Sequence, residues 1–279
     1  MREYVIADVF TRRPLEGNPV AVFLDGSGLS TETMQRAARE LNLSETVFLL
    51  AATSQADAQA RIFTPAAELP FAGHPVLGTA FVLGEASGSA LVSLQTGAGV
   101  IVVRLEREEQ QVVYGEMEQP IPTWSEFEAV TGLLAALGVA DSALPVEVYD
   151  NGPRHVFVAL EHEREVAALA PDLGALERLG AIGVSCFAVD GDRVKTRMFA
   201  PGLGVPEDPA TGSAAGPLAV HLARHGQCAF GQRLDIRQGE EIGRPSVLEA
   251  VVEGSAQRIE RVRVGGGAVI VARGQYRLD

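Results

Sequence analysis

Glu45 stands in the segment NLSETVFLL, whose other residues are typical of a buried strand. The β-branched and aromatic residues after it favour an extended backbone, and period-two alternation places Glu45 on the same face as Val47 and Leu49. Burial on such an apolar face raises the pKa of a carboxyl group and suits it to accept and return a proton near neutral pH. The alternative is that Glu45 begins the strand and points into solvent, as most glutamates do.

A second group of polar residues surrounds two glycines that precede apolar, helix-like stretches. Its members are His74, beside the first glycine, and Asp208, Thr211 and Ser213, beside the second. Together with Glu45, three of them, His74, Asp208 and Ser213, would form a proton-transfer set of two carboxylates, an imidazole and a hydroxyl. Each also has a structural interpretation, because Asp and Ser cap helices and form turns, and a lone histidine is most often a hydrogen-bonded core residue.

The two glycines, Gly73 and Gly212, are predicted to lie at helix N-termini. The first helix is expected to start at Pro75, because proline suits the first turn. The second, SAAGPLAVHLARHG, is expected to hold Pro217 near its first turn and to end at Gly226. Unpaired amide groups at helix N-termini attract anions, so a substrate carboxylate is expected there.

The two halves of the chain repeat short motifs in the same order, roughly 140 residues apart, which indicates a duplication. The pairs are GNPVAVFL with GPRHVFVAL, LSETVF with VSCFAV, RIFTP with RMFAP, and AGHPVLGTA with TGSAAGPLA. In this alignment Cys186 takes the place of Glu45, so only one half supplies the carboxylate, and Cys186 is interpreted as a small buried filler. Mixed strands and helices in each half predict an α+β fold of two pseudo-symmetric domains.

The boundary between the domains is placed near Pro122, in EQPIPTWSEFE, which has two prolines and a capping box of Ser125 and Glu128. This gives domains at 1–121 and 122–279. The charged and leucine-rich stretch from Glu161 to Gly180 is expected to form two short surface helices. Further predicted elements are strands near 4–8, 20–24, 46–50, 60–63, 90–94, 100–105 and 111–116, and a helix near 31–41.

The composition disfavours several classes of function. The formal net charge is −13 at pH 7 and lysine and arginine form no cluster, so nucleic acid is not an expected partner. No apolar run is long enough to span a membrane, and MREYVIADVF lacks the pattern of a secretory signal. Cys186 and Cys228 form no CxxC pair, so neither a disulfide framework nor a zinc site is expected. We therefore expect a cytoplasmic protein without a membrane partner.

These motifs resemble those of the PhzF-like phenazine-biosynthesis family, which shares the diaminopimelate epimerase fold. The resemblance covers essentially the whole chain and rests on GNPVAVF, NLSETVF, RIFTP, ELPFAGHPVLGTA, NGPRHVFV, EDPATGSAAGPLA and HLARHGQ. It implies two domains, each a strand barrel around a central helix, with the active site in the cleft between them, and a homodimer. The family's catalytic glutamate, histidine, aspartate and serine match Glu45, His74, Asp208 and Ser213.

The resemblance also implies a reaction, the isomerisation of trans-2,3-dihydro-3-hydroxyanthranilate to an amino-oxocyclohexene carboxylate. Glu45 would move a proton from C3 to C1, and neither a metal nor an organic cofactor is expected. The residues expected to bind this cyclic amino acid carboxylate are Ser44, Gly73, Thr211 and Gly212. Some proteins of the same fold use two facing cysteines, but the matching positions here are Ala72 and Thr211, which argues against two-thiol chemistry.

Three alternatives remain open from the sequence. The same residues could serve another small amino acid or carboxylate, since a proton-transfer set does not specify the ring it acts on. The chain could also be a small-ligand binding protein without activity. A metal hydrolase is least supported, because no HExxH motif occurs and the pair His221 and His225 is expected on a helix surface.

Overall fold

The chain divides into two compact units in the computed structural model, which describes residues 1–53 and 55–278. The first unit comprises Met1–Glu118 together with the segment that begins at Gly265, and the second comprises Gln119–Val264. No helix of the described residues has both the length and the apolar character needed to cross a membrane.

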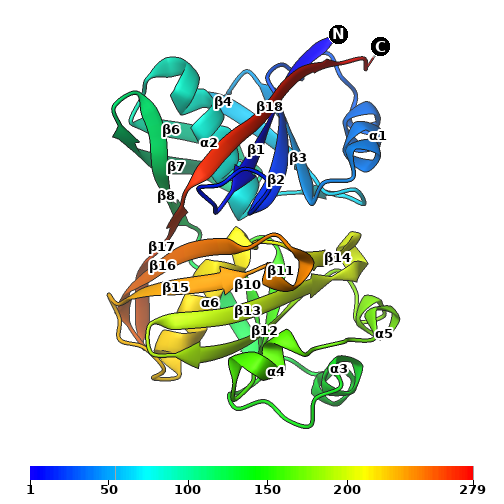
Figure 1. Ribbon diagram of the computed structural model, residues 1–279, viewed down its shortest axis with the longest axis vertical. Coiled ribbons are helices and arrows are strands. Elements are labelled where there is room, and N and C mark those ends of the chain that lie inside the picture. The colour runs from blue at the N-terminus through cyan, green and yellow to red at the C-terminus, as the bar shows by residue number, and fades with distance from the viewer. Residues whose placement is uncertain (54, 279) are drawn as a thin grey trace. The chain divides into compact units, whose positions relative to one another are not determined.

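The end of the chain folds with its beginning. Strand β18 (Ala268–Tyr276) pairs antiparallel with β1 (Arg2–Val9), from Tyr276 opposite Arg2 to Ala268 opposite Val9. In Figure 1 the red β18 runs beside the blue β1. The sequence boundary near Pro122 lies close to the observed division, whereas the last residues, which the sequence analysis placed in the second domain, belong to the first unit. A pairing between such distant segments leaves no local signal in the sequence.

The first unit consists of strands that surround helix α2 (Gly73–Ser87). The other elements are β2 (Asn18–Phe23), β3 (Glu45–Leu50), β4 (Ala58–Phe63), β5 (Glu68–Leu69), β6 (Leu91–Thr96), β7 (Gly99–Glu108), β8 (Gln111–Gln119) and the helix α1 (Thr31–Leu41). Each strand predicted in this half coincides with an observed strand, and α1 has the predicted bounds. Helix α2 is buried on all sides, as expected for a helix enclosed by strands. At Gly78 a Cβ atom would lie 2.6 Å from Val20 Cγ1, so this close approach to β2 requires glycine.

The second unit repeats this plan around helix α6 (Gly212–Arg224), which is also buried along almost its whole length. Its strands are β9 (Thr123–Glu126), β10 (Glu147–Asp150), β11 (Arg154–Ala159), β12 (Gly183–Asp190), β13 (Arg193–Ala200), β14 (Val205–Asp208), β15 (Arg233–Gln238), β16 (Ser246–Ser255) and β17 (Arg258–Gly266). The α+β fold with a central helix in each half is thereby confirmed.

Three further helices of the second unit lie at its periphery: α3 (Val130–Leu137), α4 (Glu163–Ala167) and α5 (Leu173–Glu177). The two short helices predicted between Glu161 and Gly180 are α4 and α5, which bury Val166 and Leu176 against the core. The predicted capping box at Ser125 is wrong. Ser125 lies in β9 opposite Val148, because pairing with β10 overrides the local helix signal, and α3 begins later, at Val130.

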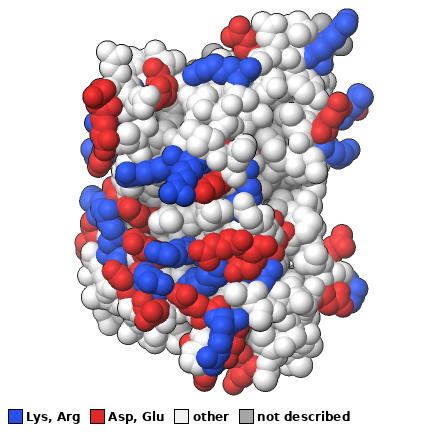
Figure 2. Space-filling model, in the orientation of Figure 1, with Lys and Arg blue, Asp and Glu red and all other residues white. Residues whose placement is uncertain are grey.

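Charged residues on the second unit occur as pairs of opposite sign. Figure 2 shows blue and red side chains interspersed over the region of β13 and β15. Lys195 lies 2.7 Å from Glu241, and Arg197 lies 2.8 Å from Glu207. On the face shown, positive and negative side chains therefore alternate, and the absence of a nucleic-acid partner stays a prediction.

Candidate active site

Glu45 is the first residue of β3 and is directed into the first unit. Helix α1 ends at Asn42, whose left-handed backbone (φ 52°) turns the chain from the helix into β3. The strand pairs in parallel with β2, with Glu45 opposite Val20. The Glu45 side chain is 13% exposed, so the alternative in which it points into solvent is wrong. Ser44, directly before the strand, is partly buried.

His74 contacts Glu45 within the first unit. Its Nε2 lies 3.3 Å from Oε2 of Glu45, and Asn18 Nδ2 lies 3.2 Å from its Nδ1. Burial lowers the pKa of His74 to about 3, and a hydrogen bond with the Pro19 backbone opposes this only in part. The imidazole is therefore neutral at pH 7, and a carboxylate and a neutral imidazole stand side by side in a buried position.

Helix α2 begins at Gly73, two residues before the predicted start at Pro75. Its N-cap, Ala72, has no side-chain oxygen and makes no capping hydrogen bond. The amide groups of the first turn are therefore not used by a cap, and together with the helix dipole they can bind an anion. The helix passes through Gly84 and ends before Gly88.

Asp208, at the end of β14, is held by two neighbouring side chains in the second unit. The Thr211 hydroxyl donates to Oδ2 of Asp208 over 2.6 Å. Gln238, at the end of β15, donates from Nε2 to the Asp208 carbonyl (2.7 Å) and to Thr211 Oγ1 (2.9 Å). All three residues are buried. This network fixes a carboxylate next to the start of α6.

Helix α6 begins at Gly212, as predicted, and its N-cap Thr211 makes no capping hydrogen bond because its hydroxyl is directed to Asp208. Both central helices thus start at a glycine whose amide, with those that follow, is not capped by a side chain. Pro217 lies in the second turn, deeper than predicted, and helix α6 ends at Arg224, just before the predicted Gly226.

Two side-chain amides compensate for the unusual start of α6. Pro217 has no N–H, so the carbonyl of Ser213, four residues earlier, receives no helical hydrogen bond from it. Asn151 Nδ2 donates to this carbonyl over 3.0 Å. Gln119 Nε2 donates to the Gly212 carbonyl over 2.8 Å. The position of Ser213 thus depends on residues from distant segments.

The structure accordingly contains two groups of candidate residues, one in each unit. Glu45, His74 and the start of α2 lie together in the first unit, and Asp208, Thr211, Ser213 and the start of α6 lie together in the second. Comparison with known proteins identifies the chain. The profile of one protein family, described as phenazine biosynthesis-like protein, matches residues 7–274. The chain belongs to this family.

Relatives within the phenazine biosynthesis-like family extend over the same length. The chain is 53% identical over 274 residues to trans-2,3-dihydro-3-hydroxyanthranilate isomerase of Pseudomonas chlororaphis, an alignment that covers 98% of this chain and 99% of the relative. A structure of a predicted epimerase from Pseudomonas aeruginosa is 35% identical, with a TM-score of 0.85 over 99% of both chains. A probable proline racemase from Agrobacterium radiobacter, 15% identical, has a TM-score of 0.71 over 100% of this chain and 94% of its own, and shares the fold alone.

The strand registers revise one detail of the internal repeat in this family member. Thr46 pairs with Phe63 of the RIF motif, and Val184 pairs with Phe199 of the RMF motif. The residue before Thr46 is Glu45, so its counterpart in the second unit is Gly183, the residue before Val184. The match of Glu45 to Cys186 is therefore wrong. The similar residues in LSETVF and VSCFAV do not occupy equivalent positions in the two pairs of strands.

Cys186 itself has the predicted environment. It is fully buried in an apolar cluster, and burial raises the pKa of its thiol to about 12, although Arg197 opposes this. A thiol with that pKa is protonated at pH 7 and is a poor nucleophile.

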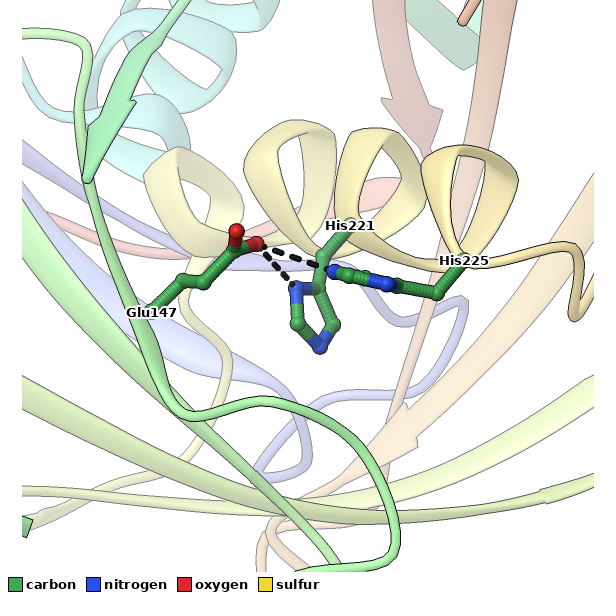
Figure 3. A group of neighbouring side chains, drawn as sticks. All are labelled: Glu147, His221 and His225. Atoms are coloured by element: carbon green, nitrogen blue, oxygen red, sulfur yellow. Dashed lines mark hydrogen bonds and ion pairs between the residues drawn. The ribbon is translucent and has the colours of Figure 1, made fainter. Parts of the chain in front are cut away.

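The pair His221 and His225 does not lie on a helix surface as predicted. Figure 3 shows both rings directed at one carboxylate, that of Glu147 on β10. Nδ1 of His221 lies 3.2 Å and Nε2 of His225 lies 3.0 Å from Oε2 of Glu147. The spacing could hold a metal ion. However, Arg224 Nη1 already places a positive charge 2.7 Å from the same oxygen, and Tyr149 donates to it over 2.8 Å.

The Glu147 carboxylate therefore already interacts with several donors of the protein. Burial acts to raise the pKa of Glu147, but hydrogen bonds from Arg224, His225 and Tyr149 outweigh it and lower the pKa to about 2. An ion at this position would have to displace the guanidinium group, which also stacks 4.2 Å above the Trp124 ring. We interpret the cluster as a structural anchor for the C-terminal end of α6.

The sequence analysis missed the residues that support the site. Asn18 orients His74, Gln238 holds Asp208 and Thr211, and Asn151 holds the Ser213 carbonyl. Asn18 and Asn151 both lie in or next to the repeated GNP and NGP motifs, so the repeat did contain a signal. Gln238 has no such signal, since it reaches Asp208 only through the fold.

Proposed function

We propose that the protein is a trans-2,3-dihydro-3-hydroxyanthranilate isomerase that transfers a proton from C3 to C1 of its substrate. The 53% identity over nearly the whole length to a relative of that name supports the substrate and the reaction. The contact of 3.3 Å between Glu45 and His74, in a buried position, is the observation that supports the mechanism.

Glu45 is the proposed acid and base. It removes the proton from C3, whose C–H bond is activated by conjugation, and returns a proton to C1, after which the enol tautomerises to the ketone. The reaction requires no redox change, and the proposal includes no metal or organic cofactor. His74 limits the conformations of Glu45 and, being neutral, adds no positive charge that would weaken the carboxylate as a base.

The two groups of candidate residues are proposed to bind the same substrate molecule. The uncapped amides at Gly73 and Gly212 bind its carboxylate, with Ser44 and Thr211 beside them. Asp208 and Ser213 bind its amino and hydroxyl groups. Glu45 would then meet a substrate whose orientation is already fixed.

The proposed assembly is a cytoplasmic homodimer, which the resemblance to the family supports. Sedimentation of the purified protein at micromolar concentration measures this directly. A single species with the mass of one chain would contradict the dimer and would leave the reaction unaffected.

The test of the reaction compares the wild type with Glu45→Gln. The wild type is expected to convert trans-2,3-dihydro-3-hydroxyanthranilate and, in deuterated water, to place deuterium at C1, both followed by NMR. Loss of the acid and base is expected to lower kcat by about 10² to 10⁴, with KM changed little. The exposed Glu3→Gln is the matched control. Turnover and deuterium incorporation that persist in Glu45→Gln would refute the mechanism, and an inactive wild type would refute the substrate.

A further inference from the structure

His155 lies beside Gly183, the counterpart of Glu45 in the second unit. In the parallel pairing of β11 and β12, His155 is opposite Gly183, as Val20 is opposite Glu45 in β2 and β3. A Cβ atom at Gly183 would lie 2.8 Å from Nδ1 and 3.4 Å from Cε1 of His155. The imidazole therefore occupies the space into which a side chain at position 183 would extend.

The environment of His155 lacks the hydrogen bonds that a buried histidine requires. The residue is 3% exposed, and neither ring nitrogen has a hydrogen-bond partner among the residues that the structure describes. Burial lowers the pKa of His155 to about 4, so the ring is neutral at pH 7, with one N–H donor and one acceptor nitrogen. Leaving both groups buried and unpaired destabilises a fold, and phenylalanine would fill a similar volume without that cost.

The other buried histidines of the chain differ in this respect. His74 has Asn18 and Glu45 as neighbours on its two sides. His221 contacts the Glu147 carboxylate and the Tyr149 hydroxyl through its Nδ1. Among these three, His155 alone has no hydrogen-bond partner at either ring nitrogen within the described residues. A hydrogen bond with a bound ligand would explain why this buried position holds a histidine.

The surroundings of His155 connect it to the candidate residues of the second unit. The sulfur of Met198 would lie 3.3 Å from the same Cβ position at Gly183, and Met198 is opposite Asp208 in the pairing of β13 and β14. Asn151, four residues before His155, donates to the carbonyl of Ser213. Strand β11 also contacts helix α6. His155 thus lies in the part of the unit that contains Asp208 and Ser213.

We propose that His155 is a substrate-binding residue that makes one hydrogen bond with the amino or the hydroxyl group of the substrate ring. The inference rests on the proposed function. In that proposal Asp208 and Ser213 bind the amino and hydroxyl groups of the substrate, and each of these groups can take part in more than one hydrogen bond. A neutral imidazole can accept from or donate to either group. It does not compete with Glu45 for the transferred proton.

The kinetic test uses His155→Phe, which keeps an aromatic ring at this position and removes both nitrogens. We expect KM for trans-2,3-dihydro-3-hydroxyanthranilate to rise at least tenfold, while the urea midpoint of unfolding stays the same or rises because two unpaired polar atoms are gone. His155→Gln, which can still form a hydrogen bond, is expected to recover part of the loss. Arg154→Gln, a change at the exposed neighbour on the same strand, is the control. A KM and kcat/KM within twofold of the wild type in His155→Phe would overturn the proposal.

A binding test separates this inference from the proposed reaction. The probe is 3-hydroxyanthranilate, an aromatic compound that carries a carboxylate, an amino group and a hydroxyl group but has no C–H bond to isomerise. NMR signals of the imidazole nitrogens are recorded for protein labelled with ¹⁵N-histidine, with and without the probe. The signals that are absent from the spectrum of His155→Phe are assigned to His155. A nitrogen shift of His155 on saturation is expected even if the wild type does not turn over the substrate. Signals of His155 that stay unchanged in the presence of the probe overturn the proposal.

Discussion

Replacing Asn151 by alanine removes the donor that satisfies the Ser213 carbonyl, to which Pro217 has no N–H to donate. Ser213 is 5% exposed, so water does not replace the lost amide. A buried carbonyl left without a donor costs about 1 to 3 kcal/mol. In the Pro217→Ala background, the new alanine supplies a helical N–H to the same carbonyl, so Asn151→Ala is expected to cost less there by about 1 to 2 kcal/mol.

The assay is urea denaturation followed by tryptophan fluorescence. Trp124 is the one tryptophan in the chain and lies in β9 of the second unit, so its signal reports on the unit that contains α6. Asn151→Asp, which keeps the shape but replaces the donor by an acceptor, should be at least as destabilising as alanine. Equal costs of Asn151→Ala in the wild-type and Pro217→Ala backgrounds would refute this compensation.

Three further predictions concern stability. The pKa of His74 and that of His155 are lowered by burial to about 3 and about 4, so the unfolded chain binds more protons than the folded one below pH 6.5. The free energy of unfolding should therefore fall as the pH falls from 7 to 4.5, by roughly 2 to 3 kcal/mol for each of these histidines. The decrease should be less steep in His155→Phe. A free energy of unfolding that does not change with pH in this range would contradict the burial of the two histidines in the neutral form. Gly78→Ala is expected to destabilise the first unit by about 1 to 3 kcal/mol, because the new Cβ atom would lie 2.6 Å from Val20 Cγ1. Gly132→Ala in helix α3, where a Cβ atom meets nothing within 4 Å, is expected to stabilise the protein by about 0.5 to 1 kcal/mol. Both variants are measured by urea denaturation followed by circular dichroism. Changes in stability of the same sign for Gly78→Ala and Gly132→Ala would contradict the packing described.

The sequence predicted the parts of the site that local patterns encode. Glu45 was found because a charged residue interrupts a strand pattern, and the helix starts were found because each follows a glycine with polar neighbours. Helix α1 was predicted with its bounds, and in the structure Ser30 caps its start and Asn42 its end. That the four predicted catalytic residues act on one substrate stays a prediction.

The features that the sequence did not predict all depend on long-range pairing. Ser125 and Glu128 have the letters of a capping box, but pairing with β10 draws Ser125 into a strand. The histidines of α6 are spaced as on any exposed helix face, and only the position of Glu147 reveals that this face is buried. The counterpart of Glu45 could be identified only from the strand registers. The similar residues around Cys186 suggest a different and incorrect match.

The pairing of β1 with β18 bears on the order in which the molecule can be completed during synthesis. The second unit is a continuous stretch of chain, and all of it is synthesised before β18. Strand β1 of the first unit lacks its partner β18 until residues 268–276 emerge. The half that carries the glutamate is therefore finished last, although it is translated first, and the nascent chain holds β1 with one edge uncovered for most of its synthesis.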